Sequence, residues 1–433
     1  MKWHLVAAAA LAMLPAASAG LAAMGGGSDD AERNRRILET LERGDSAAVR
    51  ELPGNERAIL KAAIALKSGQ PEVAAASLSG DWVKADPLAA LLVAEAYRQQ
   101  AVQAVASAGD YARNLQGERS RLEEADLTPG LREAEAKLDA MIDRIDGASD
   151  LPRDILALGS NVRSYFLVDK ARSRLIVFER DGKGQFRRVA DEYVVTGAGS
   201  GDKLREGDGR TPNGIYRFKS KSSDPALADR YGPVVVPTDY PNDLDLLHGK
   251  NGHGIWMHGF QSGVDRRPPQ DTKGCFALPN DRLPTVAAHA YPGQSLVLVG
   301  EELAFDGGGA RQALLAGVQQ MVEQWRQDWQ SLDSEAYLRH YHPQFRSGGR
   351  DLAAWSRYKR QVNSSKEYAK VGLRDFTIVH DPNRWPEGEV VLVEFEQQYE
   401  SDNFRDRGRK RLLLARSDAV SPWRILIERE IGQ

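Results

Sequence analysis

The segment Thr272-Lys273-Gly274-Cys275-Phe276-Ala277-Leu278 contains the single cysteine of this 433-residue chain, and Trp256-Met257-His258-Gly259 lies a short distance upstream. One cysteine cannot form a disulfide within the chain, so Cys275 is predicted to be a free thiol. A histidine near a cysteine can take the thiol proton and so produce the nucleophilic thiolate. The two segments therefore predict a site of nucleophilic catalysis.

The residues around these segments have the pattern of short strands. Tyr165-Phe166-Leu167-Val168 and Leu175-Ile176-Val177-Phe178 flank a polar turn, which predicts a β-hairpin. Further strands are predicted at the apolar runs 193–195, 215–218, 234–236, 255–257 and 296–299. Short strands separated by glycine-rich and proline-rich loops favour a mostly-β domain over residues 160–300, with the site on its loops.

The first 19 residues have the pattern of a secretory signal peptide. Lys2 gives a positive start, residues 5–14 are apolar, and Ala17-Ser18-Ala19 fits a small-residue cleavage site. Cleavage near Ala19 is predicted, and with it export to the periplasm. The alternative is an uncleaved anchor, although Pro15 makes this segment a poor membrane span.

Residues 30–150 are rich in amino acids that favour helix, and prolines and glycines divide them into short helices, one of them over 131–145. Residues 58–98 resemble a tetratricopeptide-type helical hairpin, but no repeat of clean period is present. Two interpretations stay open for this region. It is either a docking module, for a homodimer or an envelope partner, or a helical spacer.

The C-terminal part, residues 312–433, is predicted to be an α+β domain. Helices at 314–329, 333–341 and 352–362 precede four strands, at 371–379, 390–399, 411–415 and 423–430. The glycine-rich stretch before them predicts an independently folding module that holds substrate or a partner beside the active site. The basic run at 405–411 is interpreted as a solvated strand face.

Composition narrows the function classes. Charged residues are 27% and hydrophobic residues 42%, which is typical of a globular protein. The net charge of -3 gives no indication of nucleic-acid binding. No feature of the sequence requires a cofactor.

Three motifs together resemble the catalytic domain of the L,D-transpeptidase family, also called the YkuD domain. They are Gly207-Asp208-Gly209-Arg210-Thr211-Pro212-Asn213-Gly214-Ile215-Tyr216, the His258-Gly259 pair and Thr272-Lys273-Gly274-Cys275. Their order and spacing suit the family over residues 160–300. The Gly-Cys-Phe-Ala sequence resembles a divergent branch of the Csd6 and YafK type, which tends to carry a C-terminal NTF2-like domain. Residues 312–433 resemble such a domain.

The resemblance implies roles for individual residues. Cys275 would be the nucleophile and His258 its base, with the Gly259 carbonyl orienting the imidazole. Gly274 and Cys275 would offer backbone N–H groups to an oxyanion. Thr272 stands where the family usually has serine, and it keeps the hydroxyl group.

Several residues have more than one interpretation. Ala277 replaces an Arg or Asn that is frequent in the family, which removes one anchor for a substrate carboxylate. Arg210 either binds a peptide carboxylate or caps a loop, and Trp256 either lines the substrate groove or belongs to the core. The insertion at 224–250, with acids at 239, 243 and 245, is either a lid or a surface loop. The aromatic residues of the last domain are core or a ligand cage, with core favoured. They are Trp325, Trp329, Tyr341, Phe345 and Trp355.

Three histidines close together, His248, His253 and His258, raise the alternative of a zinc site. No carboxylate has a matching spacing, so no metal is predicted.

The implied function is a periplasmic cysteine L,D-transpeptidase acting on peptidoglycan stem peptides, with a part in cell wall organisation and cell shape. Attack by Cys275 would release the terminal D-alanine and leave a thioester. An amine acceptor gives a 3→3 crosslink, water gives an L,D-carboxypeptidase, and lipoprotein attachment or release is a third outcome. A non-catalytic envelope scaffold is the alternative from another class.

Overall fold

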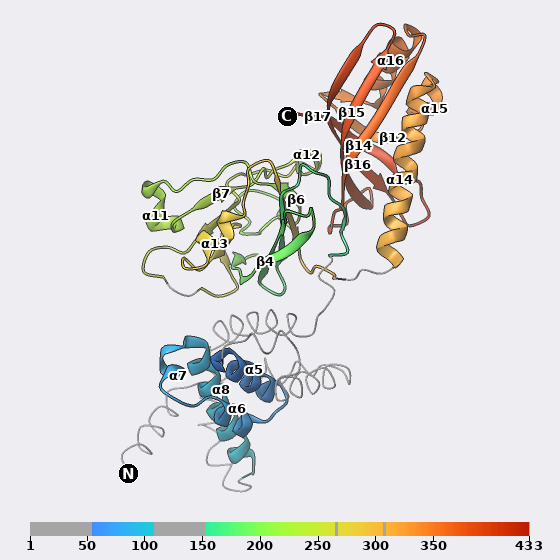
Figure 1. Ribbon diagram of the computed structural model, residues 1–433. Coiled ribbons are helices and arrows are strands. Elements are labelled where there is room, and N and C mark those ends of the chain that lie inside the picture. The colour runs from blue at the N-terminus through green and yellow to red at the C-terminus, as the bar shows by residue number, and fades with distance from the viewer. Residues whose placement is uncertain (1–53, 108–151, 265–266, 306–308, 433) are drawn as a thin grey trace, which may run out of the picture. The chain divides into compact units, whose positions relative to one another are not determined.

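The computed structural model describes residues 54–107, 152–264, 267–305 and 309–432 (Figure 1). The chain divides into two compact units, Met1–Ala148 and Ser149–Gln433. The predicted signal peptide and the helix predicted over 131–145 lie outside the described residues. Within the described ranges, no helix has both the length and the apolarity that crossing a membrane requires.

The described part of the first unit is helical, as predicted. Leu60, Ile64 and Leu92 are buried among alanines, whose small side chains allow the helices to approach closely. Glu95 and Arg98 form a fully buried ion pair with an N–O distance of 2.6 Å. The helices are α5 (Gly54–Lys67), α6 (Pro71–Ser77), α7 (Trp82–Ala85) and α8 (Pro87–Ser107).

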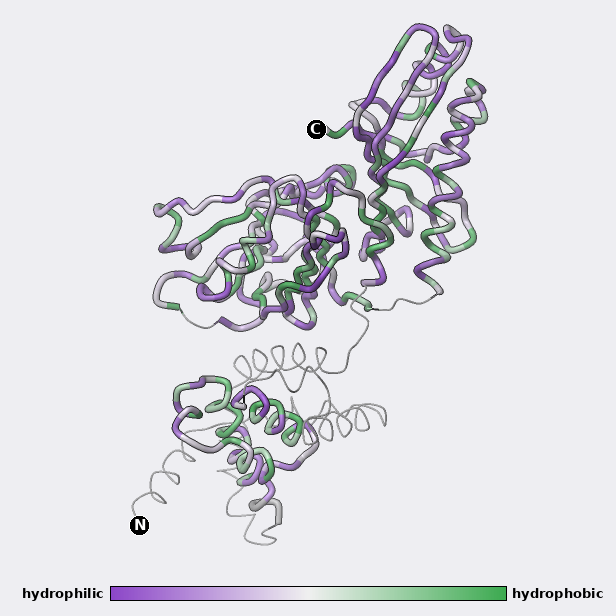
Figure 2. Tube along the Cα trace, in the orientation of Figure 1, coloured by the Kyte–Doolittle hydropathy of each residue, from purple (hydrophilic) through white to green (hydrophobic). Residues whose placement is uncertain are grey.

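The second unit begins with a five-stranded sheet in the order β4-β3-β2-β11-β6. The predicted hairpin is β2 with β3, and β11 runs parallel to β2 on its other side. The strands are β2 (Ser164–Asp169), β3 (Arg174–Arg180), β4 (Phe186–Tyr193), β6 (Gly214–Arg217) and β11 (Ser295–Gly300). In Figure 2, hydrophobic stretches gather in the part of this domain around the strand labelled β6 in Figure 1.

This sheet is buried on both faces. Along β2, Phe166 and Val168 pack into one core cluster, whereas Tyr165 and Leu167 pack into another. Side chains alternate between the faces of a strand, so the two clusters lie on opposite sides of the sheet. Burial on both faces explains why β2 and β11 are continuous apolar runs instead of alternating ones.

The first face is covered by a three-stranded sheet in the order β10-β8-β7, which contains the His258-Gly259 pair and begins its strand β10 directly after Cys275. Its strands are β7 (Val235–Pro237), β8 (Trp256–Gly259) and β10 (Phe276–Leu278). Helix α13 (Leu283–Ala288) packs into the same core through Leu283 and Val286. A two-stranded ladder, β5 (Thr196–Gly197) with β9 (Gln270–Thr272), precedes Cys275 in the same region.

Residues 224–250, interpreted above as a lid or a surface loop, are a structured part of this domain. They contain α11 (Pro225–Tyr231), β7 and α12 (Asp243–Leu247). Asp239 accepts a hydrogen bond from the Arg217 backbone N–H at 2.8 Å, and buried Asp245 lies 3.0 Å from Lys250 Nζ. Asp243 pairs with Arg429 of the C-terminal domain. The three acids therefore anchor the segment.

The second face is covered by the C-terminal seven-stranded sheet, in the order β1-β14-β15-β16-β17-β12-β13. The four predicted strands are present, and a short strand from before the catalytic domain joins them at the edge. The strands are β1 (Ile155–Ala157), β12 (Tyr341–Ser347), β13 (Arg350–Asp351), β14 (Ala369–His380), β15 (Glu389–Ser401), β16 (Arg405–Arg416) and β17 (Arg424–Ile431).

Helices pack on the other face of the C-terminal sheet. They are α14 (Gly309–Gln330), α15 (Ser334–Leu338) and α16 (Leu352–Ser364). The predicted aromatic residues of this domain belong to its buried core, so the structure favours the core interpretation over a ligand cage. Lys359 is buried with them, and its Nζ lies 4.6 Å from the centre of the Trp355 ring.

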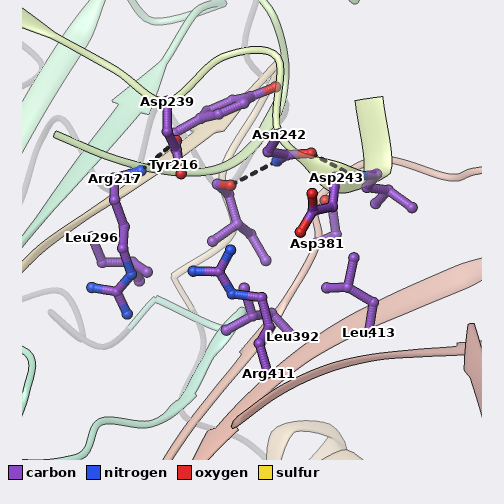
Figure 3. A pocket seen from close by; sticks show the side chains of 12 residues that line it. Tyr216, Arg217, Asp239, Asn242, Asp243, Leu296, Asp381, Leu392, Arg411 and Leu413 are labelled. Atoms are coloured by element: carbon purple, nitrogen blue, oxygen red, sulfur yellow. Dashed lines mark hydrogen bonds between the residues drawn. The ribbon is translucent and has the colours of Figure 1, made fainter. Parts of the chain in front are cut away.

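The catalytic and C-terminal domains share a core, which contradicts the prediction of an independently folding C-terminal module. Residues of the catalytic sheet pack in one cluster with Val379, Leu392 and Leu413 of the C-terminal sheet. A cavity of about 20 Å³, space for about one water molecule, lies between the two domains (Figure 3). The glycine-rich stretch is therefore a connection within one unit and not a boundary between units.

A buried charge network crosses the same boundary. Glu394 of β15 is fully buried and lies 2.5 Å from Arg217 of β6 and 2.7 Å from Arg411 of β16. Lys410 is also buried and lies 2.7 Å from Glu428. The basic run at 405–411 is therefore not a solvated face along its whole length, because its last two residues neutralise buried carboxylates.

Candidate active site

The structure brings the two motif residues together on neighbouring strands. Strands β8 and β10 run parallel, and His258 is paired in register with Ala277. Cys275 comes one residue before β10. Because side chains alternate along a strand, Cys275, Ala277 and His258 project toward the same side. The cysteine and histidine motifs are therefore on the same side of adjacent strands.

The His258 imidazole is held by the carbonyl predicted to orient it. Nδ1 lies 2.6 Å from the Gly259 oxygen, so Nδ1 carries the proton and Nε2 is left as an acceptor. Burial lowers the pKa of His258 to about 4, against the opposing effect of the Gly259 carbonyl. The imidazole is therefore neutral at physiological pH and able to accept a proton.

Gly259 is required for steric reasons that the sequence did not reveal. A Cβ at this position would lie 2.2 Å from Asn280 Oδ1 and 3.0 Å from Gly232 Cα. Asn280 in turn accepts the Phe260 N–H at 2.9 Å and donates to the Phe260 oxygen at 3.1 Å. Asn280 thus fixes the chain just after the histidine. No motif singled it out, because its role depends on tertiary proximity.

Cys275 is half-buried, with Sγ 3.2 Å from the Gly254 oxygen. Burial raises the pKa of the thiol. The Trp256 backbone N–H and the charges of Lys203 and Arg267 act in the opposite direction but do not offset it. The resting pair is therefore a neutral thiol beside a neutral imidazole, in contrast to the expected thiolate. Proton transfer then has to accompany attack on the substrate.

The loop before Cys275 is fixed by the Thr272 hydroxyl group. Thr272 Oγ1 donates to the Cys275 oxygen at 2.6 Å and accepts the Gly274 N–H at 3.1 Å. The Gly274 N–H thus already has an acceptor, which differs from its expected oxyanion role. Gly274 has a φ of 122°, and a Cβ there would lie 2.7 Å from the Arg210 oxygen. Its lack of a side chain permits this close approach.

The other two predicted site residues are Arg210 and Trp256. Arg210 Nη1 donates to the Asp202 oxygen at 3.2 Å, which supports the loop-capping interpretation. Trp256 is only partly buried, and its ring centre lies 5.3 Å from that of Tyr231. Tyr231 also meets the His258 ring edge-on at 5.2 Å. Trp256 and Tyr231 therefore form an aromatic wall beside the histidine, which favours the groove interpretation.

The three clustered histidines have separate partners. His248 lies 3.1 Å from Glu387, His253 is exposed and lies 3.7 Å from Glu206, and His258 contacts Gly259. Within the ranges that the structure describes, no group of three or more His, Cys, Asp or Glu residues is arranged to hold a metal.

Comparison with known families agrees with the motifs. Residues 163–299 match the L,D-transpeptidase catalytic domain, YkuD, and residues 317–429 match the Cds6 C-terminal NTF2-like domain. The chain therefore combines an L,D-transpeptidase-family domain with an NTF2-like domain, and a helical region precedes both in the sequence.

Two solved structures resemble about two thirds of this chain. Bd1075 of Bdellovibrio bacteriovorus is 28% identical with a TM-score of 0.56, and the match covers 65% of this chain and 98% of that one. The helical cell shape determining protein Pgp2 of Campylobacter jejuni is 27% identical with a TM-score of 0.54, covering 66% and 97% respectively. Among curated proteins no match was found.

Proposed function

We propose that the protein is a cysteine acyltransferase of the L,D-transpeptidase type that acts on peptidoglycan stem peptides. The observation that carries the proposal is the parallel pairing of β8 with β10, which sets Cys275 and His258 on one face. The family match of residues 163–299 supports the reaction class. The similarity to a protein described as determining helical cell shape supports a role in cell shape.

The reaction begins from the neutral pair. As Sγ of Cys275 attacks the carbonyl carbon of the third stem residue, the thiol proton passes to Nε2 of His258. The peptide bond to the terminal D-alanine then breaks, and its nitrogen takes the proton from His258. A thioester to Cys275 remains. Attack by an amine of a second stem forms an amide bond, whereas attack by water forms a carboxylate, and either one restores the thiol.

The proposed substrate also bears on where in the cell the protein is located. We further propose that the protein is periplasmic, on the basis of the signal-peptide pattern in residues 1–19 and of the place where stem peptides occur.

The direct test is to incubate the purified protein with disaccharide tetrapeptides and to identify the products by mass spectrometry. Loss of D-alanine with dimer formation is expected for a transpeptidase, and loss of D-alanine with tripeptide alone would assign a carboxypeptidase. A covalent adduct on Cys275 should be trapped by rapid acid quenching. Unchanged tetrapeptide, without an adduct, would contradict the proposal and favour the non-catalytic scaffold.

The pH dependence of turnover should report the buried histidine. Because the pKa of His258 is lowered to about 4, kcat/KM is expected to stay level between about pH 7 and about pH 5 and to fall below that range. Circular dichroism at each pH checks that the protein stays folded. His258→Ala should lower kcat/KM throughout, whereas His253→Ala, at an exposed position, should leave the profile unchanged. A fall in kcat/KM near pH 6.5, the ordinary pKa of histidine, would contradict the assignment of His258 as the base.

A further inference from the structure

The turn between β14 and β15, residues 381–388, lies against the catalytic domain. Trp385 of this turn is buried, and its ring stacks on the His248 ring with centres 4.8 Å apart. Lys250 Nζ lies over the same indole ring, 4.3 Å from its centre. Asn383 Nδ2 donates to the Asn213 oxygen at 3.2 Å. The C-terminal domain therefore contacts the catalytic domain here through specific polar groups as well as apolar packing.

Lys250 connects this turn to the loop formed by residues 202–213. The lysine is buried, and its Nζ lies 2.5 Å from Asp202 and 3.0 Å from Asp245. Asp202 also accepts the Asn213 backbone N–H at 2.8 Å. The indole ring covers the remaining side of the ammonium group, where a cation–π contact is strengthened by the exclusion of water. Both ends of the 202–213 loop are thus tied to the turn.

The 202–213 loop also contacts the nucleophile segment directly. Thr211 Oγ1 donates to the Cys275 oxygen at 3.3 Å. The Arg210 oxygen occupies the space that a side chain at Gly274 would need. Lys203 is close enough for its charge to act on the Cys275 thiol. A displacement of the loop would therefore move groups that touch the cysteine backbone.

We propose that Trp385, with Asn383, is a positioning residue for catalysis, through which the C-terminal domain holds the 202–213 loop against Cys275. The path runs from the indole ring to Lys250, then to Asp202 and Asn213, and then through Thr211 to Cys275. The inference rests on the proposed function for its kinetic test. Alkylation of Cys275 tests it without a substrate, because the chain has only this one cysteine.

The test compares two tryptophans of the C-terminal domain in the full chain. Trp385→Leu removes the ring above Lys250 and keeps an apolar side chain. Trp423→Leu is the matched control, because Trp423 is similarly buried but belongs to the core between α14 and the sheet. Trp385→Leu is expected to lower kcat/KM for tetrapeptide about tenfold and to change the rate of Cys275 alkylation by iodoacetamide, since small misplacements of reacting groups are costly. Trp423→Leu should change neither kcat/KM nor the alkylation rate by more than about twofold, although its loss of thermal stability should be comparable to that of Trp385→Leu.

Two further variants separate positioning from general stability. Trp385→Phe keeps an aromatic face for Lys250 and should retain most of the activity. Asn383→Ala removes only the hydrogen bond to the 202–213 loop, so it remains informative if Trp385→Leu does not fold. Equal effects of Trp385→Leu and Trp423→Leu on kcat/KM and alkylation would overturn the inference, as would unaltered rates in both Trp385→Leu and Asn383→Ala. If the wild-type protein has no turnover, the proposed function fails, and the alkylation rates still decide the positioning role.

Discussion

Cys275→Ala is expected to abolish turnover of tetrapeptide muropeptides, with a loss in kcat of at least about 10⁴-fold. In the proposed reaction the sulfur of Cys275 forms the thioester, and the chain has no second cysteine to replace it. The fold should be retained, because alanine removes only a half-buried sulfur whose polar contacts are with backbone groups of Gly254 and Trp256. The free energy of unfolding is therefore expected to change by less than about 1 kcal/mol. Product analysis by mass spectrometry and a thermal melt measure the two quantities.

Cys275→Ser is the matched control for shape. It keeps a hydroxyl at the position of the thiol, but serine is a far weaker nucleophile beside a histidine whose Nδ1 is held by a backbone carbonyl instead of a carboxylate. It should be nearly as inactive as the alanine variant and form no thioester adduct. Turnover that survives in Cys275→Ala would remove the cysteine from the mechanism, and a destabilised but active variant would assign it a purely structural part.

The sequence predicted those parts of the molecule in which the local pattern and the tertiary structure agree. β2 and β3 follow from apolar runs around a polar turn, and the pairing of His258 with the cysteine segment follows from motif order. Asn280 and Tyr231 were missed. Asn280 contacts Phe260 and Tyr231 contacts His258, in both cases across a long separation in the sequence, and neither residue belongs to a motif. Such contacts appear only once the strands have been placed.

The charge state of the Cys275 thiol is a second property that the local sequence did not predict correctly. A cysteine near a histidine predicts a thiolate, yet the degree of burial decides the charge, and burial depends on the whole domain. Burial acts on both groups here, since it raises the pKa of Cys275 and lowers that of His258. Neither ionised form is favoured at rest.

The packing between the catalytic and C-terminal domains was missed for a related reason. A glycine-rich stretch indicates a linker, but the continuous apolar runs of β2 and β11 already indicate strands buried on both faces. The sheet formed by β10, β8 and β7 covers only one of these faces, so the other face needs a second layer to bury it. That layer is the C-terminal sheet, which also takes up the three-residue strand β1. A strand this short is specified by its distant partner and not by its own sequence.

A chain that ends at Glu302 is therefore expected to lose its cooperative fold. Removing the C-terminal sheet would expose one face of the catalytic sheet, including Tyr165, Leu167, Leu296 and Leu298, all of which are now buried. At about 1.5–3 kcal/mol for each large apolar side chain, these four alone lose about 6–12 kcal/mol, which is comparable to the whole stability of an ordinary domain. Insolubility, or a melt without a transition, is the expected result of circular dichroism and solubility measurements.

The matched deletion removes the other end of the chain. Residues 1–148 form a compact unit distinct from 149–433, so a chain that begins at Ser149 should keep its cooperative melt and the alkylation rate of Cys275. The contrast between the two deletions is the test, since both remove more than 100 residues, but the deletion after Glu302 divides a compact unit and uncovers a sheet face within it, whereas the deletion before Ser149 follows the division between the two units. A soluble chain ending at Glu302, with a sharp transition and a Cys275 that reacts as in the full chain, would show that the catalytic sheet tolerates an open face. The C-terminal domain would then be an appended module, and the positioning role of Trp385 would lose its structural basis.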